Sequence, residues 1–394
     1  MEKMIDFDEL YSRRGSDCKK YNPGKFSEDI LPMWIADTDF RCPIECIEAA
    51  KERVNHECYG YPYELPEFNS AVKSYLNNRH GWEIEEDWVE FVTGVVPAAI
   101  FAIRAFTNPG DKVVVQTPLY PPLREAVRDN GRLLDEQSLV EHEGYYTIDF
   151  VELEKSFRDP RTKMYILVNP HNPVGRSWTR KELEKLAELC IKYNIIVFND
   201  EIHSDIIYGN NRHVCFHNLN EEIANLTITS SNPGKTFNVA GVRTAYVLIS
   251  NKELRDKFLV SRKNNKAMGR TVIGQQVFIA AYSQCEYYVD QLVPYLEKNV
   301  NFVEQFISEK LPEIKFTKPE ATYLMWLDCR ELGLDQKELM NLFENVGKVG
   351  FNDGSSFGNE GTGFVRMNIA APRKIVEEGL RRIEKAVQEW RNSN

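Results

Sequence analysis

Residues 164–201, MYILVNPHNPVGRSWTRKELEKLAELCIKYNIIVFNDE, contain two apolar runs separated by an amphipathic segment. The runs at 164–168 and 195–198 have the length and composition of buried strands. Between them, Thr179 is followed three residues later by Glu182, which predicts a capping box at the start of a helix. A strand, a helix and a second strand in this order are typical of a parallel sheet that helices cover on both faces.

The same alternation extends over most of the chain. We expect further strands at 88–93, 112–116, 226–229 and 245–249. We expect helices at about 66–80, from Pro97 onward, and at 121–130. After about Tyr287 the pattern changes to a long helix, a strand at 323–328, a helix near 337–344, a strand at 364–369 and a closing helix. The sequence therefore predicts an α/β fold, with a mostly parallel mixed sheet covered by helices and a smaller α+β domain.

The chain of 394 residues has no low-complexity stretch or obvious linker, so we expect its domains to share one continuous chain. The expected division is an N-terminal arm at 1–45 that belongs to the small domain, a large domain at 46–286 and a small C-terminal domain at 287–394. Ligands of such sheets bind at the carboxyl ends of the strands. Functional residues are therefore expected in the loops that follow the strands.

Composition argues against several classes of function. A net charge of −10 does not suit a nucleic-acid-binding surface, which needs clustered Lys and Arg. No window approaches the ~20 apolar residues of a membrane span, and the first residues lack the apolar core of an export signal, so we expect the cytoplasm. The eight cysteines lack the paired spacing of a zinc site. We expect reduced thiols and no metal.

Two of the loops that follow predicted strands contain residues typical of tight turns. Gly94, Val95 and Val96 join a predicted strand to a helix start, where free N–H groups and the helix dipole favour a phosphate. A tight connection without a ligand is an equally good interpretation of this loop. The segment NPHNPVG at 169–175 holds two Asn-Pro pairs, which make the turn rigid and aim Asn172 at the sheet edge. We favour a functional role for Asn172.

Two more loops carry charged side chains. Asp200 follows a buried strand, where an acid is costly without a partner, and a protonated ring nitrogen would be such a partner. A helix N-cap is the alternative. His203 lines the same pocket or simply packs there. Lys235 lies in SSNPGKTFN at 230–238, among small residues and Pro, and a desolvated lysine forms imines readily. An exposed turn lysine is the alternative.

Taken together, these loops resemble the aspartate-aminotransferase superfamily of pyridoxal-phosphate enzymes (class I/II aminotransferases). The closer resemblance is to its MalY/PatB-like branch of cystathionine β-lyases and other carbon–sulfur lyases. It spans almost the whole chain and rests on segments in family order, namely RRG (13–15), LPMWIADTDF (31–40), YGY (59–61), TPLYPP (117–122), NPHNPVG (169–175), DEIHSD (200–205), KTFNVAG (235–241), ATYLMWLD (321–328) and GFVRMN (363–368).

The resemblance implies fold type I, the fold of pyridoxal 5'-phosphate-dependent transferases, and a role for each matching residue. Lys235 would hold the cofactor as a Schiff base and act as catalytic base, and Tyr120 would stack on its ring and take part in catalysis. Two further residues would contact the cofactor ring, Asp200 at the pyridine nitrogen and Asn172 at the phenolic oxygen. The implied phosphate contacts are the amides of Gly94, Val95 and Val96 and the side chains of Arg243 and Asn232. Tyr61 would reach the phosphate of a neighbouring subunit, which implies a homodimer with shared active sites. Arg366 would bind the substrate α-carboxylate, and Ala36 of the arm is a further implied substrate contact.

Two positions depart from the family pattern. Gly234 stands where the family usually carries Ser just before the lysine, and Asn232 where Ser or Ala is common, so the phosphate contacts of this turn differ. Thr38 replaces the usual Met of the arm signature, which alters the expected substrate pocket.

The activity implied is β-elimination from cystathionine or a related cysteine conjugate, a small-molecule substrate, to pyruvate, ammonia and a thiol. An aminotransferase is the alternative, because it shares every residue named above. A regulatory protein that acts through partner binding is a third possibility, against which the intact Lys235 and Asp200 argue. A transcription factor with an appended aminotransferase-like domain is not expected, because the arm starts at Met1.

Overall fold

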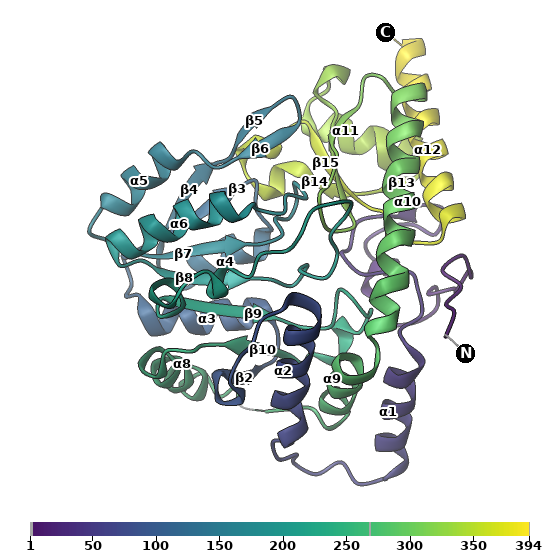
Figure 1. Ribbon diagram of the computed structural model, residues 1–394. Helices are drawn as coiled ribbons and strands as arrows, with labels where there is room; N and C mark the ends of the chain where they lie inside the picture. Colours follow the sequence, from purple (N-terminus) through teal and green to yellow (C-terminus); the bar gives the residue numbers. More distant parts are fainter. Residues whose placement is uncertain (1–2, 268, 394) are drawn as a thin grey trace.

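The computed structural model describes residues 3–267 and 269–393 and contains a large seven-stranded sheet and a smaller four-stranded sheet (Figure 1). The large sheet has the order β2-β10-β9-β8-β7-β3-β4. Its strands are β2 (Val89–Val92), β3 (Lys112–Thr117), β4 (Leu133–Ser138), β7 (Thr162–Val168), β8 (Ile196–Asp200), β9 (Thr227–Ser231) and β10 (Ala245–Leu248). Strand β10 runs antiparallel to β2 and β9, and every other neighbouring pair is parallel. The predicted mostly parallel mixed sheet is confirmed.

Helices cover both faces of the large sheet. Alternate residues of each strand point to opposite faces, so neighbouring residues of one strand pack against different helices. On β3, Val113 and Val115 pack in one core with α3, α4 and α8, whereas Val114 packs in another core with α5 and α6. The helices of this part are α3 (Val95–Phe106), α4 (Pro121–Arg128), α5 (Phe150–Arg158), α6 (Arg180–Tyr193), α7 (Glu221–Ala224) and α8 (Lys252–Asn264). The capping box predicted from Thr179 and Glu182 is present at the start of α6.

The small sheet has the order β11-β12-β15-β14. Its strands are β11 (Lys315–Thr317), β12 (Leu324–Asp328), β14 (Asn352–Asp353) and β15 (Phe364–Asn368), and its helices are α10 (Glu286–Lys310), α11 (Gln336–Asn341) and α12 (Arg373–Ser393). Three further helices, α1 (Ile44–Asn55), α2 (Pro66–His80) and α9 (Val272–Gln284), pack into the same core as α10 and α12. A hairpin of β5 (Val140–His142) and β6 (Tyr145–Thr147) projects beside the small sheet (Figure 1).

The N-terminal segment is tied to the C-terminal part of the chain. Strand β1 (Leu31–Pro32) pairs in parallel with β13 (Val349–Gly350), and the Asp39 N–H donates to the Ala370 carbonyl. Ala36, which follows β1, contacts both parts of the chain, because its carbonyl accepts hydrogen bonds from Lys235 Nζ and from the Tyr323 hydroxyl. The division of the chain at residues 45 and 286 stays a prediction.

Several elements differ from the sequence predictions. The helix expected from Pro97 begins at Val95. Its N-cap is Gly94, which makes no side-chain hydrogen bond. The helix expected at 121–130 ends at Arg128. The helix near 337–344 ends at Asn341 and continues as a turn of π-helix. No strand was predicted for β4 and no helix for α8 or α9.

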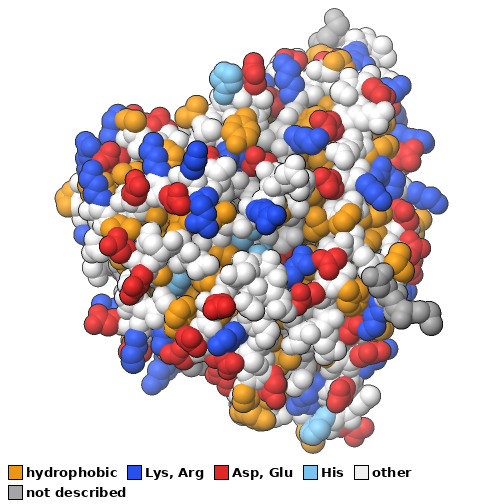
Figure 2. Space-filling view, viewed as in Figure 1, with side chains coloured by type: hydrophobic (Ala, Val, Ile, Leu, Met, Phe, Trp, Pro, Cys, Tyr) orange, Lys and Arg blue, Asp and Glu red, His pale blue; other side chains and the backbone are white. Residues whose placement is uncertain are grey.

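The surface agrees with the charge pattern of the sequence. Figure 2 shows acidic and basic side chains interspersed over the face in view, with no extended field of one sign. None of the helices in the described part of the chain is long and apolar enough to cross a membrane.

Candidate active site

Three of the predicted loops start side by side at one edge of the large sheet. The register of the parallel strands places Val168 of β7 opposite Asp200 of β8, and Asp200 opposite Ser230 of β9. The loops that follow these strands carry Asn172, the carboxylate of Asp200 and Lys235. The strand order thus gathers residues that are far apart in the sequence, as the position of the loops predicted.

Lys235 lies in the interior, with only part of its surface accessible. Its Nζ donates a hydrogen bond of 2.6 Å to the carbonyl oxygen of Ala36. Burial, followed by the charge of Arg366, lowers the pKa of Lys235 to about 8, against the opposing charges of Asp37 and Asp200. A large share of the amine is therefore neutral near pH 8, which suits a nucleophile or a base. The exposed-turn alternative for Lys235 is wrong.

Asp200 is buried, and its Oδ1 accepts a hydrogen bond of 3.0 Å from the Ile202 N–H. Burial raises the pKa of this carboxyl to about 7. None of the described cationic side chains forms an ion pair with it. Residues 202–205 form a turn, so the helix N-cap interpretation of Asp200 is wrong. A cationic N–H brought to this carboxyl would compensate its burial and favour the charged form.

Arg366, on β15, is a buried cation in the same region. One Nη donates to Asn172 Oδ1 at 3.1 Å, and the other donates to Asn352 Oδ1 at 2.6 Å and to the Trp34 carbonyl at 3.0 Å. Its Nε has no hydrogen-bond partner. Burial lowers the pKa of the guanidinium to about 10, so Arg366 stays charged at neutral pH. No described carboxylate pairs with it, which leaves it available for the carboxylate of a ligand.

Tyr120 and the segment Gly94–Val96 complete this end of the sheet. Tyr120 precedes α4, and burial raises the pKa of its hydroxyl, with Arg366 and Asp200 near enough to influence it. The amides of Val95 and Val96 at the start of α3 donate to no acceptor in the described part of the chain. Such free amides at a helix start suit an anion such as phosphate.

The turn before Lys235 explains one departure from the family pattern. Asn232 Oδ1 accepts a hydrogen bond of 2.7 Å from the Gly234 N–H. A Cβ atom at Gly234 would lie 2.6 Å from this oxygen and 2.9 Å from Ala240 Cα, so glycine is required here. Asn232 therefore uses its oxygen within the turn, and only its amide nitrogen is left to contact a ligand.

Two of the predicted residues, Arg243 and Tyr61, are exposed in the single chain. Arg243 is exposed and has a left-handed backbone with φ of 53° at the end of a short 3-10 turn. Tyr61 is fully exposed, at 106% of its reference area, in the loop between α1 and α2. The structure thus brings together Lys235, Asp200, Asn172, Tyr120, Arg366 and Ala36, whereas Tyr61 faces solvent.

Three further residues lie at this cluster, namely Asn352 and Tyr323, which the sequence did not single out, and His203, whose role it left open. Asn352 binds Arg366, and the Tyr323 hydroxyl donates to the Ala36 carbonyl at 3.2 Å. His203, left open above, is buried edge-on against Tyr323, with ring centroids 5.8 Å apart. Burial and the charges of Lys235 and Arg366 hold the pKa of His203 well below its usual value, so the ring is neutral. Tyr323 lies in one of the segments of the resemblance, but no sequence signal marks Asn352.

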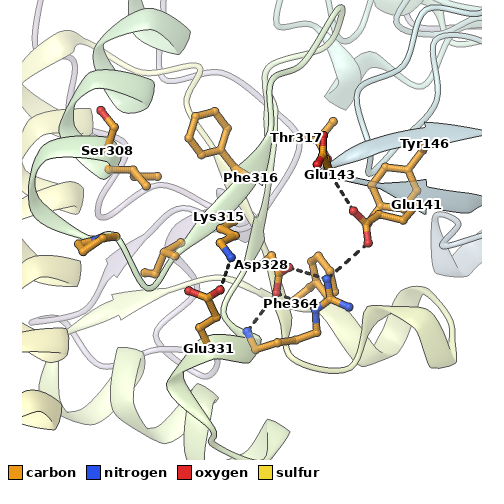
Figure 3. A pocket seen from close by; sticks show the side chains of 15 residues that line it. Glu141, Glu143, Tyr146, Ser308, Lys315, Phe316, Thr317, Asp328, Glu331 and Phe364 are labelled. Carbon is orange, nitrogen blue, oxygen red and sulfur yellow. Dashed lines mark hydrogen bonds and ion pairs between the residues drawn. The ribbon is translucent and has the colours of Figure 1, made fainter.

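A large cavity in the described part of the chain lies elsewhere. It has a volume of about 840 Å³ and is lined by the β5–β6 hairpin, β11 and the end of α10 (Figure 3). Most of its charged side chains pair with one another, as in the bonds from Arg330 to Asp328 at 2.6 Å and to Glu141 at 3.6 Å. We therefore place the active site at the Lys235 cluster, where charged groups lack partners.

The chain is similar to several known proteins. The family model for aminotransferase class I and II matches residues 29–383. The cystathionine beta-lyase PatB of Bacillus subtilis (strain 168) is 40% identical over 388 residues, which cover 97% of this chain and 100% of that protein. Protein MalY of Escherichia coli (strain K12) is 31% identical, over 98% of this chain and 99% of MalY.

The crystal structure of cystalysin from Treponema denticola, which contains a pyridoxal 5'-phosphate cofactor, matches with a TM-score of 0.95. It is 36% identical and covers 98% of this chain and 100% of the cystalysin chain. The resemblance to the MalY/PatB-like branch and the expected fold type I are confirmed. Since the family model spans most of the sequence and the relatives match over their whole length, the chain belongs to the aminotransferase class I and II family.

Proposed function

We propose that this protein is a pyridoxal 5'-phosphate-dependent carbon–sulfur β-lyase that cleaves cystathionine or a related cysteine conjugate to pyruvate, ammonia and a thiol. The observation that carries the proposal is the 40% identity, over 97% of this chain and 100% of its relative, to a protein named cystathionine beta-lyase. The part-buried Lys235 and the buried Asp200 and Arg366 supply the charges that such a reaction needs.

The residues of the site fit the cofactor. Asp200 is a buried carboxyl without a cationic partner, and a protonated pyridine nitrogen would be that partner. The free amides of Val95 and Val96 suit the phosphate, and the Asn172 side-chain nitrogen is left to donate to the phenolic oxygen because its Oδ1 already accepts from Arg366. The lowered pKa of Lys235 suits attack on the aldehyde. When bound, pyridoxal phosphate supplies an electron sink for the pair left on the substrate α-carbon.

The side chains of this protein then divide the work on the substrate. Arg366 binds the α-carboxylate through two N–H groups and fixes the orientation of the α-carbon. Lys235 removes the α-proton as a general base, since its pKa of about 8 leaves enough neutral amine near neutrality. The bond between the β-carbon and sulfur breaks, the sulfur keeps the electron pair, and Tyr120 donates or positions the proton that it receives. Water then converts the remaining three-carbon fragment to pyruvate and ammonia.

A lyase and an aminotransferase differ in what they need to turn over repeatedly. A lyase expels the thiolate and releases ammonia, whereas an aminotransferase retains the amino group until a keto acid removes it. We expect cystathionine, cystine and cysteine to yield pyruvate and ammonia in equal amounts over many turnovers with no keto acid added. The sulfur product should be homocysteine from cystathionine, cysteine persulfide from cystine and hydrogen sulfide from cysteine, in the same amount as pyruvate. Thiolates are good leaving groups because the thiol pKa is about 8.5. The measurement is pyruvate and ammonia per active site after prolonged incubation.

Alanine is the matched control, because it has no group to expel from its β-carbon. It should give no pyruvate beyond one equivalent per site. If cystathionine also stops after one turnover, and a keto acid restarts the reaction, the protein is an aminotransferase and not a lyase.

We also propose that the protein is a cytoplasmic homodimer with shared active sites. The loop between α1 and α2 exposes three tyrosines, Tyr59, Tyr61 and Tyr63, and such a concentration of exposed aromatic surface is typical of an interface. Tyr61 makes no contact with the Lys235 cluster of its own chain. In a dimer it would contact the phosphate site of the second subunit.

Mixed dimers test the shared site. Tyr61→Ala and Lys235→Ala should each be nearly inactive alone. Refolding or exchanging equal amounts of the two should restore up to about one quarter of wild-type activity, because half of the dimers are mixed and each has one intact site. Two copies of the Tyr61→Ala chain differently tagged serve as the control for exchange. A fully active monomer, or no recovery in mixtures shown to exchange, would contradict the proposal.

A further inference from the structure

A cluster of three possible metal ligands lies directly behind the active site. Glu201 follows Asp200 in the chain, and His213 and Cys215 lie in the irregular segment before a short 3-10 turn at Phe216–Asn218. One ligand atom from each of the three side chains, a carboxylate oxygen, a ring nitrogen and a thiol sulfur, lies within 4.8 Å of the other two. The reaction described above uses none of these groups.

The His213 ring lacks a hydrogen-bond partner although it is buried. Its side chain is 2% exposed, and neither ring nitrogen makes a hydrogen bond. The Nε2 atom lies 3.1 Å from Glu201 Oε2, but outside hydrogen-bonding geometry. The Nδ1 atom thus has no partner among the described residues, and a buried polar atom without a partner costs free energy unless a ligand compensates it.

The surroundings fix Glu201 in the orientation that a metal ligand needs. Its Oε1 accepts hydrogen bonds from Asn199 Nδ2 at 2.8 Å and from the Phe216 N–H at 3.2 Å. These bonds occupy one carboxylate oxygen and leave Oε2 directed toward His213. Hydrogen bonds of this kind commonly orient the carboxylate ligands of metals.

We propose that Glu201, His213 and Cys215 bind a zinc ion. A thiolate, an imidazole and a carboxylate form a ligand set that zinc accepts, and the thiolate disfavours magnesium or calcium. Zinc bonds of about 2.0–2.3 Å in tetrahedral geometry place ligand atoms about 3.3–3.8 Å apart. The three ligand atoms therefore need to draw together by at most about 1.5 Å, which side-chain rotations supply.

A cavity lies on the His213 side of the cluster. It has a volume of about 620 Å³ and is lined by His80, Asp205 and His213, among other residues. The His80 ring lies 5.3 Å from the His213 ring and pairs through Nε2 with Asp205 Oδ1 at 3.2 Å. With three protein ligands, a water molecule would supply the fourth ligand of a tetrahedral zinc ion at this site.

Zinc content of the tag-free holoenzyme tests this site. After incubation with zinc chloride and dialysis against a weak chelator, the wild-type protein should retain about one zinc per chain, with one sulfur ligand at about 2.3 Å in its X-ray absorption spectrum. Cys215→Ser and His213→Gln should each lower the retained zinc at least tenfold. Cys190→Ser is the matched control, because Cys190 is buried in α6 away from the cluster, and it should retain wild-type zinc.

Cofactor absorbance and circular dichroism, measured without zinc, show whether each variant folds. If Cys215→Ser does not fold, His213→Gln carries the test alone. Retention of less than a tenth of an equivalent by the wild-type protein would overturn the proposal. So would equal retention by wild type and the folded ligand variants, and either result would leave Glu201 and His213 as a buried ion pair without a metal.

Discussion

Substitution of Lys235 by alanine should lower the rate of pyruvate formation by about 10⁴-fold, because a general base contributes up to about that factor. Lys235 is the only described lysine that approaches Asp200, Arg366 and Ala36 together, and its pKa of about 8 suits both attack on the cofactor aldehyde and removal of the α-proton. No neighbouring amine can replace it. The measurement is pyruvate release from cystathionine under saturating cofactor.

Covalent labelling checks the same residue independently of activity. Borohydride reduction of the wild-type holoenzyme, followed by peptide mass mapping, should place the cofactor on Lys235. Lys263→Ala is the matched control, because Lys263 is an exposed lysine near the end of α8, and it should keep both the label and the activity. A label on Lys263 or Lys266 in the wild-type protein would contradict the assignment of Lys235.

The sequence predicted the site residues that lie in loops at the carboxyl ends of neighbouring parallel strands. Asn172, Asp200 and Lys235 each follow an apolar run that could be recognised as a strand. Parallel neighbouring strands necessarily bring their carboxyl ends together. The helix start at Gly94 was also recognisable, although α3 begins two residues earlier than predicted because Val95 and Val96, not Pro97, open the helix.

Other parts could not be predicted, because they depend on how separate elements pack. Strand β4 at the edge of the large sheet reads LLDEQS, with no buried residue and no apolar alternation that would indicate a strand. Asn352 meets Arg366 only through the antiparallel register of β14 and β15, which pairs the two residues directly. His213 and Cys215 lie in an irregular segment without periodicity, so their approach to Glu201 had no sequence signal.

The role of Arg366 came only from the family resemblance, and the structure now supplies a physical reason for it. The guanidinium is buried, and its hydrogen bonds go to neutral oxygens of Asn172, Asn352 and the Trp34 backbone. Burial lowers its pKa to about 10, which leaves the group cationic at the pH of any assay near neutrality. An unpaired buried cation is unfavourable, and the carboxylate of an amino-acid substrate would compensate it.

We therefore expect Arg366→Ala to lower kcat/KM for cystathionine by about 30- to 5,000-fold, equivalent to the ~2–5 kcal/mol lost when a desolvated charge loses its partner. Most of the loss should lie in KM, while the absorption spectrum of the bound cofactor stays unchanged. Arg366→Lys should recover only part of the loss, because an ammonium restores the charge but not the planar pair of N–H donors.

An amine analogue of the substrate that lacks the α-carboxylate separates recognition from general damage to the site. Its slow turnover should be the same in the wild-type and Arg366→Ala proteins, because it has no group for the guanidinium to bind. If Arg366→Ala instead slows the analogue and the amino acid equally, the arginine acts by holding Asn172 and Asn352 in place. The substrate carboxylate is then bound elsewhere, and the backbone of the arm from Trp34 to Ala36 is the next candidate.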